Sequence, residues 1–75
     1  SKKYIEHIKT VPDIDNGIIK VLPIVKGVEY GDIIEVVVFE GDNEVAKAKA
    51  AVGEELVLSV PNAKFGHQNH HFYMI

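Results

Sequence analysis

The stretch IIEVVVFEGDN, residues 33–43, decides the fold class. Ile34, Val36 and Val38 lie two residues apart, and in an extended chain such residues share one face. The Gly-Asp-Asn that closes the stretch is typical of a tight turn. The stretch therefore predicts a strand over residues 33–39 that ends in a hairpin.

The segment after this turn is expected to return as a second strand, over residues 45–50. Alanine and lysine both favour helices, but here they alternate as Ala46-Lys47-Ala48-Lys49-Ala50. This is the period of a strand with a narrow apolar face. Outward lysines discourage the pairing of sheet edges, so we expect an edge strand beside residues 36–39.

The same alternation recurs along the rest of the chain, with glycine, asparagine or aspartate between the runs. Short strands separated by turn residues at intervals of about 8 to 12 residues are typical of an all-β sandwich or barrel. The predicted strands cover residues 4–9, 18–25, 33–39, 45–50, 56–60 and 72–75. The predicted core consists of Ile34, Val36, Val38, Leu56, Leu58 and Val60.

The predicted strand over residues 18–25 is apolar on both faces. Ile18, Leu22 and Ile24 face away from the odd-numbered apolar residues of the same run. Pro23 cannot donate a ladder hydrogen bond, which places the strand at a sheet edge or at a bulge. Two interpretations stay open: another domain covers the outer face, making Ile18, Leu22 and Ile24 an interface, or a bulge switches the facing partway.

Composition excludes several classes of function. The 75 residues include eight lysines, no arginine and no cysteine, with a formal charge of -3, 47% apolar residues and 25% charged residues. This balance is typical of a folded globular domain and lacks the basic stripe of a nucleic-acid module. Thiolate chemistry and disulfides are excluded. No apolar run reaches the roughly 18 residues of a membrane span.

The densest group of candidate metal ligands is HQNHH, residues 67–71. His67, His70 and His71 are weak candidates, because their spacing matches no metal motif and no carboxylate follows nearby. A solvated loop is the first interpretation, opportunistic metal binding the second and a functional metal site the third.

The remaining polar residues indicate no chemistry. Asp13-Ile14-Asp15-Asn16-Gly17 lacks the bidentate Glu of a calcium loop, so it predicts a turn with positive φ at Asn-Gly. Ser1 and Ser59, the only serines, lie in no nucleophile motif. We assign no catalytic residue and no cofactor. The six carboxylates assigned to outer faces and turns are Glu35, Glu40, Asp42, Glu44, Glu54 and Glu55.

Three motifs, taken in order, resemble the immunoglobulin-like domain of family 2 glycoside hydrolases, which include β-galactosidases, β-glucuronidases and β-mannosidases. Pro12-Asp13-Ile14-Asp15-Asn16-Gly17 is similar to the opening of that domain, and residues 34–41 with Glu44-Val45-Ala46 to its central hairpin. Residues 56–65, LVLSVPNAKF, are similar to its strand and Pro-Asn-x-x-Leu turn. The Trp-Ser-Pro-Glu-x-Pro segment that follows in the family is replaced by GHQNHH, residues 66–71.

The resemblance implies an all-β, immunoglobulin-like, two-sheet antiparallel β-sandwich over residues 1–75. It implies a non-catalytic spacer in a bacterial enzyme that hydrolyses O-glycosidic bonds, of the β-galactosidase type. The implied partners are a sugar-binding jelly roll and the barrel that carries catalysis, in the cytoplasm or the periplasm. A free-standing carbohydrate-binding or adhesion module is the alternative, although no cluster of aromatic residues favours it.

Length is the last expectation. A sandwich of this kind usually takes about 100 residues, so the chain is expected to be part of a larger protein and to lack its last strand. An incomplete sheet exposes an edge, which predicts self-association through that edge. No nucleic-acid or membrane partner is expected.

Overall fold

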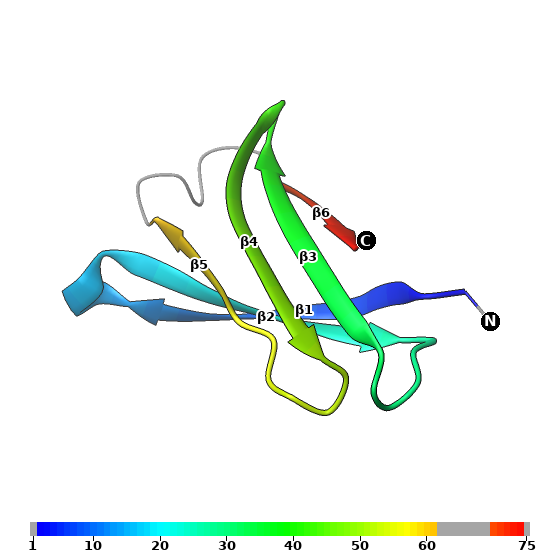
Figure 1. Cartoon of the computed structure of the whole chain (residues 1–75). Coiled ribbons are helices and arrows are strands. Elements are labelled where there is room, and N and C mark those ends of the chain that lie inside the picture. The colour runs from blue at the N-terminus through cyan, green and yellow to red at the C-terminus, as the bar shows by residue number, and fades with distance from the viewer. Residues whose placement is uncertain (1, 62–69, 75) are drawn as a thin grey trace.

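Six strands and one short turn of 3₁₀ helix make up the computed structural model, which describes residues 2–61 and 70–74 (Figure 1). The elements in chain order are β1 (Tyr4–Asp13), η1 (Ile14–Asn16), β2 (Ile18–Lys26), β3 (Ile33–Glu40), β4 (Asn43–Ala51), β5 (Leu58–Pro61) and β6 (His70–Met74).

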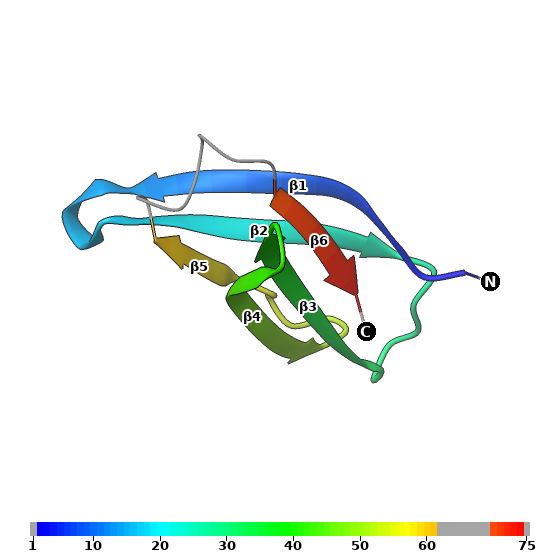
Figure 2. The ribbon, with the colours of Figure 1, turned by 90° about the horizontal axis from the view of Figure 1, so that it is seen from above.

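The strands form two antiparallel sheets of three strands each, in the orders β1-β2-β5 and β4-β3-β6. The sheets lie face to face as a sandwich, and Figures 1 and 2 show that their strands cross rather than run alongside one another. One side of the sandwich is closed where β4 lies against β5. The predicted all-β, two-sheet antiparallel fold is confirmed.

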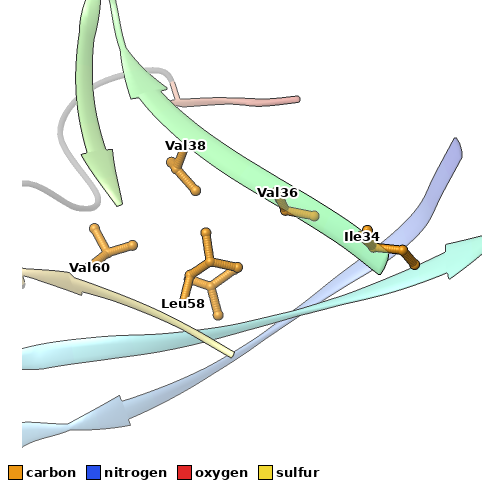
Figure 3. Packing of buried hydrophobic residues seen from close by; sticks show 6 residues of the cluster. Ile34, Val36, Val38, Leu58 and Val60 are labelled. Carbon is orange, nitrogen blue, oxygen red and sulfur yellow. The ribbon is translucent and has the colours of Figure 1, made fainter. Parts of the chain in front are cut away.

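The core lies between the inner faces of β2, β3 and β5. Ile34, Val36 and Val38 lie along β3; Figure 3 shows Leu58 and Val60 of β5 below Val38, and Ile34 at the far end of β3. All five side chains are at most 6% exposed. Burial of each such side chain contributes about 1.5–3 kcal/mol. These five predicted core residues are confirmed, while the sixth, Leu56, is half-buried against the cluster.

The hairpin predicted at residues 41–43 joins β3 to β4. Its ladder runs from Ile33 opposite Ala51 to Glu40 opposite Asn43. On β4, Ala46 and Ala48 pack against the core, whereas Lys47 and Lys49 are exposed. β4 is an edge strand, as the outward lysines predicted.

The turn predicted at residues 13–17 is also confirmed. It is the short 3₁₀ segment η1, in which the Asn16 side-chain amide donates to Asp13 Oδ2 at 2.9 Å. Gly17 has φ +66 and its N–H donates to the Ile14 carbonyl at 3.1 Å. This tight connection keeps β1 and β2 paired to their ends, so β1 extends to Asp13 and not only to residue 9.

Two predicted boundaries differ at the other end of the chain. β5 begins at Leu58 and not at residue 56, because the ladder between β2 and β5 starts where Val21 faces Leu58. β6 begins at His70, two residues before the prediction, because pairing with β3 reaches Glu40. Residue 75 lies outside the described residues.

Candidate functional site

The register of β2 shows whether its even-numbered apolar residues form one outer face or whether a bulge turns some of them toward the core. Val21 is fully buried, and Ile19 and Val25 pack against the core. Pairing with β1 has one irregularity, at Glu6 of β1, and none within β2. The facing therefore does not switch along β2, and Ile18, Leu22 and Ile24 share the face that points away from the core.

Ladder neighbours extend this outer face over the sheet. Directly opposed residues of antiparallel strands project from the same face. Val11 is opposite Lys20, Lys9 opposite Leu22, and His7 opposite Ile24. Ile24 is 43% exposed and Val11 is 41% exposed. We call Val11, Ile18, Leu22 and Ile24 the outer patch; it is an apolar strip crossed by the lysines at 9 and 20.

Pro23 lies where the sheet becomes narrower. β5 pairs with Ile18 to Val21, so within residues 2–61 and 70–74 the half of β2 that contains Pro23 has one strand neighbour, β1. Pro23 therefore lies on a locally open edge, one of the two positions predicted from its lack of a backbone N–H. A cleft of about 490 Å³ follows this open half of β2 and is closed on its far side by residues 50–56.

This cleft is apolar, with two carboxylates among the residues that line it. Leu22, Val25 and Leu56 contribute to its walls, and Glu54 and Glu55 belong to the lining. The Ala51 N–H donates to Glu54 Oε1 at 3.0 Å, so one of these carboxylates serves the turn in which it lies. The other described residues that line the cleft are apolar or glycine, so its walls fit contact with an apolar surface.

The candidate metal ligands are not brought together by the described part of the chain. His67 lies outside the described residues. His70 and His71 are neighbours on β6 and therefore project from opposite faces. His70 Nε2 lies 3.9 Å from Glu40 Oε2. Within residues 2–61 and 70–74, no group of three or more histidine or acidic side chains could hold a metal ion.

All six carboxylates were predicted to lie on outer faces or turns, and four of them are exposed. Asp42, Glu44, Glu54 and Glu55 are exposed. Glu35 and Glu40 are half-buried; Glu35 Oε2 lies 4.0 Å from the Lys49 ammonium, and Glu40 faces the His70 imidazole. Exposed carboxylates contribute little to stability, and so does a carboxylate that is paired with an exposed lysine, as Glu35 is.

The sheet β4-β3-β6 carries an aromatic pair that the sequence analysis did not predict. On its outer face the rings of Phe39 and Tyr73 meet edge to face, with centroids 5.6 Å apart and planes at 75°. Val37, on the same face and directly opposite Tyr73, is only 4% exposed. The signal was present as the unbroken apolar run of residues 36–39, in which Val37 and Phe39 break strict alternation.

Comparisons with known proteins leave the family open. Neither protein-family models nor curated protein sequences match the chain. The described residues contain no helix long and apolar enough to cross a membrane. The three motifs and the outer patch are therefore the observations from which a function is inferred.

Proposed function

We propose that this chain is a non-catalytic β-sandwich module of a multidomain bacterial family 2 glycoside hydrolase, of the β-galactosidase type. The module acts as a rigid spacer between a sugar-binding domain and a catalytic barrel, and hydrolysis of the O-glycosidic bond takes place in the barrel. The observation that carries the proposal is the outer patch, an apolar face on the far side of the sheet from the core.

The outer patch supports the spacer proposal because its side chains lie outside the core and can contact a second domain. Ile24 and Val11 each leave about two fifths of their side-chain surface exposed, and Leu22 and Ile18 are half-buried. Burial of such a surface against a second domain is favourable at roughly 25 cal/mol per Å². Exposed apolar surface bordered by polar residues, here the lysines at 9 and 20, marks sites of contact with other proteins or domains.

The placement of the three motifs supports the same role. The first motif, residues 12–17, forms the connection between β1 and β2, and the second forms the β3–β4 hairpin. The third supplies Leu58 and Val60 of β5, two fully buried residues. Each motif builds a turn or a core strand of a sandwich, which is the structural role that the resemblance assigns to them.

A free-standing carbohydrate-binding module is the second candidate, and one observation favours it. Tyr73 is 55% exposed beside Phe39, and exposed aromatic rings stack on sugars. Because the two rings meet edge to face, they present one ring face to a sugar and not a flat surface made of two rings. This candidate predicts glycan binding by the chain alone, whereas the spacer predicts none.

The reading frame on either side of these residues tests the proposal. A spacer requires a barrel-coding region in the same frame downstream and a jelly-roll region upstream. A stop codon directly after Ile75 in the natural gene would contradict the proposal. Glycan binding by the isolated chain, measured by isothermal titration calorimetry with galactosides and glucuronides, would favour the second candidate instead.

A further inference from the structure

Among the described strands four form the edges of the two sheets, and three of these carry features that oppose pairing with another chain. β4 presents Lys47 and Lys49, β1 has an irregularity at Glu6 and contains Pro12, and β5 has only four residues and ends at Pro61. Lysines, bulges, prolines and short length are the means by which natural sheets protect their edges.

β6 is only one residue longer than β5 but has none of the other three features. Its five residues, HHFYM, include no lysine, proline or glycine, and they pair with β3 without a register shift. Figure 2 shows β6 at the margin of its sheet, on the side of β3 away from β4. Among the described residues no strand pairs with its outer side.

The interior of the sandwich is open beside this edge. A cleft of about 440 Å³ lies between β1 and β6, lined by Ile5, Glu6, His7, Ile8 and Phe72. Phe72 and Met74 are half-buried on the inner face of β6. A strand added to β6 would cover this cleft and bury apolar surface in addition to its backbone hydrogen bonds.

We propose that the β6 strands of two copies of this chain pair antiparallel across a two-fold axis, joining two three-stranded sheets into one. In the fully overlapped register Phe72 lies opposite the partner's Phe72, and His71 lies opposite the partner's Tyr73. Isologous contacts of this kind use the same surface on both copies.

The sequence of β6 is complementary to itself in this register. On the inner face the two Phe72 rings form the central pair, beside the clefts of both copies. On the outer face His71 of each copy lies opposite Tyr73 of the other. Cross-strand aromatic pairs stabilise antiparallel sheets. No two acidic or lysine side chains of β6 face each other, since the strand contains none. These features favour a second copy over an unrelated acidic or basic peptide.

Sedimentation equilibrium of the 75-residue chain over a wide concentration range tests the inference with two matched double variants. His71→Lys with Tyr73→Lys places lysine opposite lysine across the axis, whereas His71→Lys with Tyr73→Glu places lysine opposite glutamate. Both variants lose the same Phe39–Tyr73 contact. We expect a dimer for the unmodified chain and the Lys/Glu variant, and a dimer weakened about tenfold or more for the Lys/Lys variant.

Disulfide trapping provides a second measurement that does not depend on the charged variants. The chain has no cysteine, so His71→Cys and Tyr73→Cys can be made singly and mixed under mild oxidation. The proposed register sets the thiol introduced at position 71 of one copy opposite the thiol introduced at position 73 of the other, within reach of a disulfide. We expect the mixed disulfide to exceed its statistical half of all dimers.

Three results would overturn the inference: a monomer at every concentration, equal weakening by the two double variants, or a statistical mixture of disulfides. Loss of the dimer in Leu22→Ser with Ile24→Ser, but not in the Lys/Lys variant, would assign self-association to the outer patch instead. Circular dichroism and thermal unfolding establish that each variant is folded before these comparisons.

Discussion

The α-carbon of Gly27 lies directly against the main chain of Lys2. An added Cβ at Gly27 would collide with the Lys2 carbonyl oxygen and stand 2.8 Å from its carbonyl carbon, and Gly27 has φ +75. The contact follows from the ladder, because Tyr4 opposite Lys26 is the last pair between β1 and β2. Gly27 thus lets the chain leave β2 while the start of β1 passes close beside it.

Gly27→Ala is expected to destabilise the domain more than Gly17→Ala. Both glycines have positive φ, which costs other residues about 1–2 kcal/mol, but no atom lies within 4 Å of a Cβ at Gly17. The collision at Gly27 adds a further ~1–3 kcal/mol. Urea unfolding measures both losses, and equal losses would show that the contact with Lys2 has no role. Hydrogen exchange should show faster exchange at Tyr4 only in Gly27→Ala.

Leu58→Ala tests the assignment of the core. Leu58 is fully buried between the sheets, so its truncation should cost about 2–5 kcal/mol. A domain of this size is stable by roughly 4–11 kcal/mol, so the variant should lie close to unfolding. Leu56→Ala is the matched control, since Leu56 is half-buried and should lose about half as much. Equal losses in urea unfolding would contradict the packing.

Lys47→Val with Lys49→Val should aggregate faster without a loss of stability. Lys49 Nζ lies 4.0 Å from Glu35 with 64% of its side chain exposed, a contact worth at most about 1 kcal/mol. Valine also favours strands. The lysines instead protect the β4 edge from pairing. Light scattering at equal concentration should show the difference, and the double arginine variant, which keeps both charges, should behave like the unmodified chain.

The strands and most of the core were predictable because the signal is local. A period of two places Val36, Val38 and Leu58 on inner faces whatever the topology, and all three are buried. The Gly-Asp-Asn turn likewise determines its own hairpin. Turn chemistry and alternation need no knowledge of distant residues.

The ends of the ladders and the open edges were not predictable because they depend on the order of strands. β5 starts at Leu58 since that residue faces Val21, which lies three strands earlier in the chain. The two interpretations of Ile18, Leu22 and Ile24 needed the register with β1 before one could be selected. The clefts are likewise lined by residues far apart in sequence, such as Ile5 and Phe72.

The central claim is that the outer patch is covered in the parent protein, and the absence of native cysteine allows a direct measurement. Ile24→Cys reports on the outer patch and Lys47→Cys on the exposed face of β4. The rate of thiol labelling is measured for each variant in the 75-residue chain and in the longer protein that the proposed function requires. We predict that the thiol at position 24 is labelled at least about tenfold more slowly in the longer protein, as expected for a residue buried against another domain, and that the rate at position 47 changes less. Equal labelling at position 24 in the two proteins would contradict the spacer function.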